Sequence, residues 1–351
     1  MSAYDAARQL VGEAIRGGVF PAATIEVGSS SGPMWSDALG ALTFENRAPA
    51  TAADTPFDLA SLTKPLATTT VVMELIRTGV LRLDEPVSAF FSDWRGADRT
   101  AVTIRDLLEH ASGLPARLVD PPPGSRREFE HEIGAIRLEY APRSASIYSD
   151  LGFILLGFIV VDRGGMSLAD QFAPIAARLM SDTTYGLTSE RRALAAPTLP
   201  MDEDPRRGRF LAGEVHDNYA AALGGVAGHA GLFGTAASVG AFARATLRAA
   251  RGADDVALPL TPALVSEFTS RTTVPGSSRA LGWDTMLPTS SCGTRMSRRA
   301  FGHVGFTGTS LWIDPQRDRY FVLLANRACG GGTLDQMRAV RRAFHDALGD
   351  L

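Results

Sequence analysis

Residues 57–79 read FDLASLTKPLATTTVVMELIRTG, and the fold assignment starts from this segment. Its apolar residues recur with a helical period, and Gly79 follows the last of them as a stop signal. Pro65 is tolerated only near the start of a helix, where its missing N–H has no intrahelical acceptor. The helix is therefore predicted to begin close to Ser61, which places Ser61 and Lys64 on one face, a turn apart.

The spacing of Ser61 and Lys64 suits a nucleophile and its base. A serine hydroxyl is a weak nucleophile unless an adjacent group takes its proton, and a lysine does so when burial or positive charge lowers its pKa. A helix N-terminus adds positive potential where an oxyanion would develop. Alone the pair is weak evidence, because S-x-x-K occurs by chance and a serine at a helix start is usually a cap.

Strand patterns occur at both ends of the chain, and helical patterns occur between them. A hairpin is predicted from 22–28 and 35–44, later strands at 281–286, 300–305, 310–314 and 320–325, and a last helix opened by a Thr333/Gln336 capping box. We therefore expect an α/β (α+β) fold, with one antiparallel sheet flanked by the terminal helices. The predicted α/β domain comprises 1–75 and 280–351, the inserted helical domain 76–279, and the active-site cleft lies between them.

Composition narrows the classes of partner. The chain has 351 residues, 45% of them hydrophobic, and a formal charge of −3, so it can form a large core and offers no basic field for nucleic acid. The arginine clusters at 206–209 and 298–299 are expected in solvated loops. Cys292 and Cys329 lack metal-type spacing and are interpreted as reduced thiols.

No membrane partner is expected either. The N-terminal residues lack a basic stretch followed by an apolar one, and the longest apolar run, Phe153 to Val161, is far below the roughly 20 residues that span a bilayer. We expect a cytoplasmic protein, or a periplasmic one if a leader has been removed.

Two further motifs follow Ser61 and Lys64 in order: Tyr148-Ser149-Asp150 and His303-Val304-Gly305. The set S-x-x-K, Y-x-D and H-x-G departs from the S-x-x-K, S-D-N and K-T-G version in its last two elements. With the flanking stretches TIRDLLEHASGLP (103–115), YSDLGFILLG (148–157), GGVAGHAGLF (224–233) and GHVGFTGTSLWIDP (302–315), the chain resembles the serine β-lactamase and penicillin-binding-protein superfamily. It is nearer the class C enzymes, DD-peptidases and esterases, in which tyrosine occupies the second element.

The resemblance implies a role for each matched residue. Ser61 would be acylated, Lys64 would activate it, and Tyr148 would carry protons to the leaving group and from the deacylating water. Asp150 stands where the family usually has asparagine, and an ionised carboxylate cannot donate an amide N–H to a substrate. His303 and Gly305 would line the cleft, and the backbone N–H groups of Ser61 and Phe306 would form the oxyanion hole.

His216 and His229 raise the alternative of a metal site. Their spacing around Asp217 matches no standard zinc pattern, so no metal is expected. In relatives with a similar VHDN…GGVAGHAG stretch this region borders the cleft, which makes both histidines secondary substrate-binding candidates. His110 resembles a structural turn of the family.

The mechanism implied is acyl transfer in two steps without a cofactor, in which Ser61 attacks an ester or amide carbonyl and water releases the acyl group. The substrate would be a β-lactam, a D-alanyl peptide or a carboxyl ester, and the fold does not choose among them. Three alternatives remain: a catalytically silent binding protein, an acyltransferase and a metal hydrolase using His216 and His229. The sequence does not specify an oligomeric state.

His303 occupies the position where relatives place a lysine beside the substrate carboxylate. Histidine is mostly neutral above its ordinary pKa of about 6.5, so small activated esters are expected to be better substrates than penicillins unless a nearby arginine replaces the cation. KM for carboxylate-bearing substrates is then expected to improve as the pH falls towards about 6. Arg295, Arg298 and Arg299 are the arginines closest in sequence.

Overall fold

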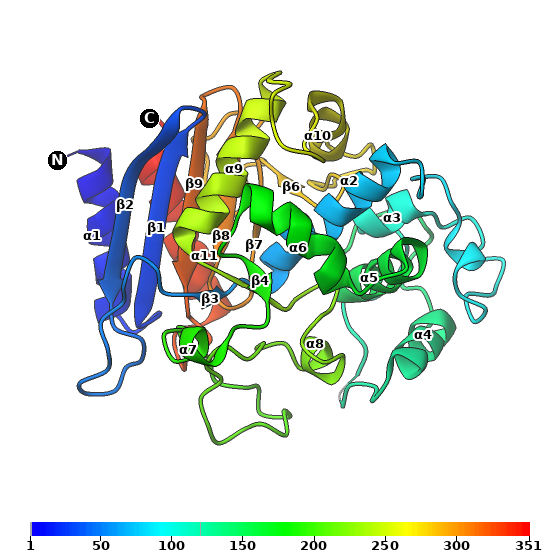
Figure 1. Cartoon of the computed structure of the whole chain (residues 1–351), viewed down its shortest axis with the longest axis horizontal. Coiled ribbons are helices and arrows are strands. Elements are labelled where there is room, and N and C mark those ends of the chain that lie inside the picture. Colours follow the sequence, from blue (N-terminus) through cyan, green and yellow to red (C-terminus); the bar gives the residue numbers. More distant parts are fainter. Residues whose placement is uncertain (1, 120) are drawn as a thin grey trace.

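The computed structural model describes residues 2–119 and 121–351. Its main sheet has six antiparallel strands in the order β2-β1-β9-β8-β7-β6. Because β1 pairs directly with β9, the two ends of the chain form one sheet, as predicted (Figure 1). The strands are β1 (Ala22–Ser29), β2 (Gly32–Gly40), β6 (Asp284–Thr285), β7 (Phe301–Val304), β8 (Ser310–Asp314) and β9 (Arg319–Ala325).

The predicted hairpin is confirmed, although β2 lies earlier than the predicted 35–44. The strand predicted at 281–286 is shorter, since only Asp284 and Thr285 pair with β7. The backbone N–H groups of Leu281 and Gly282 donate instead to the carbonyls of Phe268 and Leu108. Contacts with remote segments therefore replace the sheet ladder there.

Helices cover both faces of the sheet. α1 (Ala3–Arg16) and α11 (Leu334–Leu348) pack side by side on one face, and α9 (Ala236–Ala250) contacts β1, β8 and β9 on the other (Figure 1). The predicted capping box is present, with Gln336 N–H donating to Thr333 Oγ1 at 3.2 Å and Thr333 N–H donating to Gln336 Oε1 at 2.8 Å. Leu334, in the first turn of α11, is exposed.

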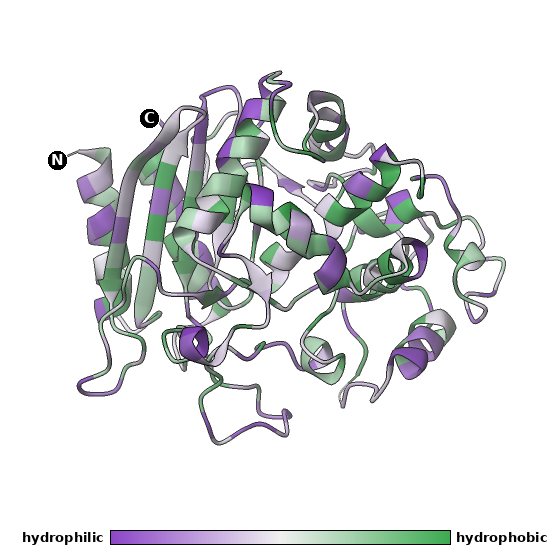
Figure 2. Ribbon diagram, viewed as in Figure 1, coloured by the Kyte–Doolittle hydropathy of each residue, from purple (hydrophilic) through white to green (hydrophobic). Residues whose placement is uncertain are grey.

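The rest of the middle region is mostly helical, as predicted. α5 runs through its centre almost completely buried, and Figure 2 shows its predominantly hydrophobic colouring. A small sheet in the order β3-β5-β4 joins this region to the segment before Ser61. These elements are α2 (Thr70–Arg77), α3 (Ile104–Leu108), α4 (Arg126–Ala135), α5 (Asp150–Gly164), α6 (Leu168–Leu179), α7 (Ser189–Arg192), α8 (Asn218–Ala222), α10 (Pro262–Thr269), β3 (Phe57–Asp58), β4 (Thr184–Tyr185) and β5 (Leu232–Gly234).

The largest hydrophobic core extends across the predicted domain boundary. It contains Val322 and Leu324 of β9 together with Val72 of α2, Phe153 of α5 and Phe242 of α9. The division at residues 76 and 279 stays a prediction. What the packing establishes is that sheet and helices share one continuous core.

Within the described part of the chain, no individual helix has both the length and the apolar character needed to cross a bilayer. α5 and α6 meet those limits only as a pair, with a bend of 88° between them.

Candidate active site

A cavity of about 450 Å³ contains most of the residues singled out from the sequence. It lies where β7 approaches the segment around Ser61 and the loop that precedes α8. Lys64 is completely buried beneath it and reaches it through its contact with Ser61. The predicted residues that line the cavity are Ser61, Tyr148, Asp150, His216, His229, His303, Gly305 and Phe306.

The backbone around Ser61 is held by short-range and long-range hydrogen bonds. Ser61 lies in a 3₁₀ turn, Ala60–Leu62, that leads into a π-helical turn, Lys64–Thr69, and then into α2, so a helical segment does begin at the predicted place. Ala60 has φ 48°, in the left-handed region that non-glycine residues rarely occupy, and its N–H donates to Asp58 Oδ1 at 2.8 Å. This strained turn directs Ser61 into the cavity.

Lys64 uses all three of its N–H donors. Its Nζ contacts Ser61 Oγ at 3.0 Å, Asp150 Oδ1 at 2.8 Å and the carbonyl oxygen of His229 at 3.1 Å. Burial by itself lowers the pKa of Lys64, but Asp150 and Tyr148 together outweigh that effect and hold the pKa above its ordinary value. The resting protein therefore does not meet the condition of a lowered lysine pKa, because Asp150 supplies a counter-ion that asparagine would not.

Tyr148 also contacts Ser61. Its Oη donates to Ser61 Oγ at 2.6 Å, and Lys64 Nζ lies 4.8 Å from the centre of its ring. Burial raises the pKa of Tyr148, so the resting side chain is a neutral phenol. His110 packs against the ring at a centroid distance of 4.7 Å and accepts the N–H of Ser149 at 3.1 Å. The turn containing His110 therefore positions Tyr148.

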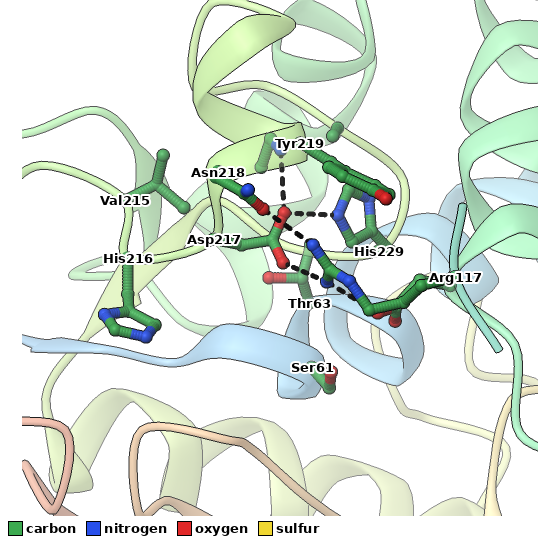
Figure 3. Close-up of polar contacts among 12 residues, drawn as sticks. Ser61, Thr63, Arg117, Val215, His216, Asp217, Asn218, Tyr219 and His229 are labelled. Atoms are coloured by element: carbon green, nitrogen blue, oxygen red, sulfur yellow. Dashed lines mark hydrogen bonds and ion pairs between the residues drawn. The ribbon is translucent and has the colours of Figure 1, made fainter. Parts of the chain in front are cut away.

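Asp150 belongs to a closed ring of charged contacts. Its Oδ1 contacts Lys64, and its Oδ2 accepts from Arg117 Nη1 at 3.2 Å. Arg117 Nη1 also donates to Asp217 Oδ2 at 2.8 Å, and Asp217 Oδ1 contacts His229 Nε2 at 2.8 Å. Figure 3 shows the Asp217 carboxylate between the His229 ring and the Arg117 guanidinium. The carbonyl of His229, which accepts from Lys64, closes the ring.

This ring explains the ionisation of its carboxylates. Burial alone would raise the pKa of both Asp150 and Asp217. Lys64 has the largest lowering effect on the pKa of Asp150. His229 and Arg117 lower the pKa of Asp217. Both carboxylates are therefore ionised, and both oxygens of Asp150 are already engaged. The substrate contact predicted for Asp150 stays a prediction; its contacts in the structure are with Lys64 and Arg117.

The segment after β7 lies beside Ser61. Among the described residues, the backbone N–H groups of Ser61 and Phe306 have no acceptor, which leaves both available to an oxyanion. Arg327 Nη2 donates to the carbonyl of Phe306 at 2.9 Å, and Thr307 Oγ1 donates to the carbonyl of Asp58 at 2.8 Å. These contacts fix the two peptides relative to each other.

Gly305 lines the cavity as predicted, and the packing around it explains why the residue is glycine. A Cβ atom there would lie 2.1 Å from Thr309 Oγ1 and 2.6 Å from the carbonyl oxygen of Leu59. Thr309 Oγ1 itself donates to that carbonyl at 3.0 Å. The residue is therefore small because the turn after β7 packs directly against the segment that carries Ser61.

His303 is buried, and it contacts its own strand and a neighbouring aromatic ring. Its Nδ1 lies 2.9 Å from the carbonyl of Val304, and its ring faces Tyr148 at 5.9 Å. Burial, with Arg279 and Lys64 nearby, lowers the pKa of His303 well below its ordinary value. The expected gain in its charge near pH 6 is therefore wrong, because a desolvated imidazole beside two cations stays neutral.

His216 and His229 line the same cavity but have different partners. His216 stacks on Phe306 at a centroid distance of 5.4 Å, and burial lowers its pKa to about 4. Figure 3 shows the His216 ring apart from the contact between His229 and Asp217. Within residues 2–119 and 121–351, no group of three or more His, Cys, Asp or Glu side chains is arranged to hold a metal ion.

Four arginines that line the cavity were not found from the sequence: Arg117, Arg279, Arg338 and Arg341. None of them belongs to the S-x-x-K, Y-x-D or H-x-G motif, so no motif spacing pointed to it. The arginines that were considered lie elsewhere. Arg298 and Arg299 line a separate cavity, and Arg295 pairs with Asp350.

Known proteins similar to this chain point to one family. A family model described as Beta-lactamase matches residues 7–344. A relative from Escherichia coli K12, named for D-alanyl-D-alanine carboxypeptidase activity, is 30% identical over 309 residues, which cover 78% of this chain and 69% of the relative.

Solved structures show the same fold at lower identity. EstCE1, described as a hydrolase with promiscuous acyltransferase activity, has a TM-score of 0.77 at 22% identity and covers 98% of each chain. A β-lactamase/D-alanine carboxypeptidase from Pseudomonas syringae has a TM-score of 0.76 at 16% identity, again covering 98% of each chain. With the family model matching nearly its whole length, the chain belongs to the β-lactamase family.

Proposed function

We propose that this protein is a serine hydrolase that forms an acyl-enzyme on Ser61 and hydrolyses a D-alanyl peptide or a related ester. The observation that carries the proposal is the double hydrogen bond to the nucleophile, from Lys64 Nζ at 3.0 Å and from Tyr148 Oη at 2.6 Å. The name of the 30% identical relative supports the D-alanyl class of substrate. β-Lactams contain a strained amide bond, which the same attack would open.

The first step concerns protons. Lys64 and Tyr148 both donate a hydrogen bond to Ser61 at rest. One proton must therefore leave these two side chains before Ser61 can lose its own proton. Asp150, at 2.8 Å, is the acceptor in contact with Lys64. Transfer of one proton from the Lys64 ammonium to the Asp150 carboxylate leaves a neutral amine, and this amine takes the proton of Ser61 as Oγ attacks the carbonyl carbon.

The remaining steps follow from the same contacts. The oxyanion of the tetrahedral intermediate accepts from the N–H groups of Ser61 and Phe306. When the intermediate collapses, the bond to the leaving group breaks and Tyr148 delivers a proton to it, which Lys64 replaces. Water then repeats the sequence on the acyl-enzyme and releases a carboxylic acid.

Intact-mass analysis tests this proposal. The protein is exposed to a fluorophosphonate, a p-nitrophenyl ester, a penicillin and an acyl-D-alanyl-D-alanine peptide, and the modified residue is located by peptide mapping. We expect a covalent adduct on Ser61 that Ser61→Ala abolishes. Ser291 also lines the cavity, so Ser291→Ala is the matched control and retains the adduct.

The outcomes separate the alternatives. An adduct on another residue, or turnover that survives Ser61→Ala, would overturn the proposal. Saturable binding without acylation would support a silent binding protein. Formation of an ester with an added alcohol, in place of the free carboxylic acid, would support an acyltransferase.

A further inference from the structure

The carboxylate of Asp58 joins the turn that carries Ser61 to a loop far away along the chain. Asp58 belongs to β3, and its side chain is buried. Its Oδ1 accepts the N–H of Ala60 at 2.8 Å, and its Oδ2 accepts the N–H of His216 at 2.6 Å. Each oxygen of one carboxylate therefore holds one backbone N–H, and the two N–H groups come from different segments.

Both segments lead to the donors of the proposed oxyanion hole. The peptide between Ala60 and Ser61 supplies the first donor, and Ala60 has its left-handed φ of 48° where its own N–H is held by Asp58. The His216 ring stacks on Phe306, whose N–H is the second donor, at a centroid distance of 5.4 Å. The two contacts of Asp58 thus act on both halves of the hole.

Further contacts anchor Asp58 and the His216 peptide. The carbonyl of Asp58 accepts from Thr307 Oγ1 at 2.8 Å, and the carbonyl of His216 accepts from Arg206 Nη2 at 3.2 Å. Arg206 is itself paired with Asp204 at 2.5 Å. Charged side chains therefore hold both the N–H and the carbonyl of His216.

We propose that Asp58 is a positioning residue that holds the two donors of the oxyanion hole in place, through Ala60 and His216. The inference rests on the proposed function and adds how its oxyanion site is preorganised. An ionised carboxylate accepts at both oxygens, whereas an asparagine amide has one oxygen and turns an NH₂ group towards the other N–H. Asp58 acts through the two backbone segments and not on the reacting atoms.

Asp58→Asn is expected to lower kcat for a p-nitrophenyl ester about 10- to 100-fold with little change in KM, because a displaced oxyanion donor weakens binding of the transition state and not of the ground state. Asp314→Asn is the matched control. Asp314 is also buried and accepts backbone N–H groups, from Ser297 at 2.7 Å and Gln316 at 3.1 Å, but it lies at the end of β8 away from the turn after β7. It is expected to keep the kcat of the parent protein.

His216→Ala tests the path to Phe306. It removes the stacked ring and keeps the N–H that Asp58 accepts, so we expect a smaller loss of kcat than in Asp58→Asn. In the double variant, Asp58→Asn should cost less than it does in the parent protein, because the two changes interrupt the same path. Losses that simply add would overturn the path through His216.

A pH series separates positioning from a loss of packing. Burial raises the pKa of Asp58 to about 6, with Asp217 adding to the rise and the two N–H donors and Arg206 opposing it. His216, whose pKa is lowered to about 4, stays neutral through this range. Above the pKa of Asp58 the carboxylate is ionised, and below it the protonated acid resembles asparagine.

The ratio of kcat in the parent to kcat in Asp58→Asn is therefore expected to fall towards one as the pH drops from about 8 to about 5. The ionisations on which attack by Ser61 depends are common to both proteins and cancel in this ratio. The corresponding ratio for Asp314→Asn stays constant.

Three results would overturn the assignment: the parent kcat in Asp58→Asn, an equal loss in Asp314→Asn, or a ratio that does not change with pH. If Asp58→Asn does not fold, an unchanged kcat in His216→Ala would overturn it. Turnover of the ester by Ser61→Ala would instead reject the proposed function, so the two failures are distinguishable.

Discussion

At the scale of single residues, Ser61, the proposed nucleophile, is surrounded by groups that hold one proton too many for the proposed attack. Ser61 Oγ accepts from Lys64 and Tyr148, and Asp150 stabilises the charged form of Lys64. Relatives with asparagine in place of Asp150 lack that carboxylate. The protonation state of the Lys64–Asp150 pair should therefore govern the pH dependence of this protein.

Asp150→Asn is expected to move the rising limb of the pH–activity profile to lower pH. The proposed attack needs Lys64 as a neutral amine, a form that becomes more populated as the pH rises through the pKa of the pair. Asp150 raises the pKa of Lys64 while burial lowers it, so the substitution removes the raising effect and leaves the lowering one.

This shift is measured as kcat/KM for a neutral p-nitrophenyl ester across the pH range. Asp335→Asn, at an exposed side chain of α11, serves as the control and keeps the parent profile. A limb that stays in place or moves to higher pH would contradict the role given to Asp150.

Tyr148→Phe is expected to lower kcat by about 10²- to 10⁴-fold, because it removes the proton carrier and keeps the ring that packs on His110. The loss should be greatest for substrates with a poor leaving group, which need a proton to depart. Steady-state kinetics on a matched amide and activated ester measure the difference. Equal losses on both substrates would assign Tyr148 to the activation of Ser61 alone.

At the scale of elements, the turn after β7 and the segment from β3 to the 3₁₀ turn act as one unit. Thr307 and Thr309 donate to the carbonyls of Asp58 and Leu59, and Gly305 fits between them without a side chain. The oxyanion peptides are thereby held by contacts between two segments far apart along the chain.

Gly305→Ala is expected to destabilise the fold by about 1–3 kcal/mol, because its Cβ would overlap Thr309 and Leu59. It should also reduce kcat, since relief of the overlap displaces the N–H of Ser61 or Phe306. Denaturant unfolding and ester kinetics measure the two effects. Gly124→Ala is the control, because its Cβ would meet only Glu128 Oε2, at 3.6 Å. If Gly305→Ala has the same free energy of unfolding as the parent protein, the turn after β7 can shift without cost.

At the scale of the whole molecule, sheet and helices share a core. β9 contributes Val322 and Leu324, and the middle region contributes Phe153 and Phe242, to one cluster. Neither part can bury its apolar surface without the other.

We therefore expect the protein to unfold in a single cooperative transition, with near-UV circular dichroism and esterase activity lost together. A fragment comprising residues 76–279, the predicted helical domain, is expected not to fold alone, because α9 would expose the face that covers the sheet. A fragment with native-like dispersion in its NMR spectrum would contradict this and support two independent domains.

The sequence alone predicted the fold class, the paired strands from both ends of the chain, the capping box of the last helix and a set of motif residues that meet around one cavity. These follow from local periodicity, from the helical spacing of Ser61 and Lys64 and from motif order, all of which are written along the chain. Only the tertiary structure decided that Lys64 is charged beside Asp150 and that His303 is neutral. It also decided that Arg117, Asp217 and His229 close a ring of contacts behind Lys64. Arg279 was likewise placed at the cavity by the tertiary structure alone. Ionisation and side-chain direction depend on burial and on neighbours brought together from distant segments, and no spacing in the sequence specifies them.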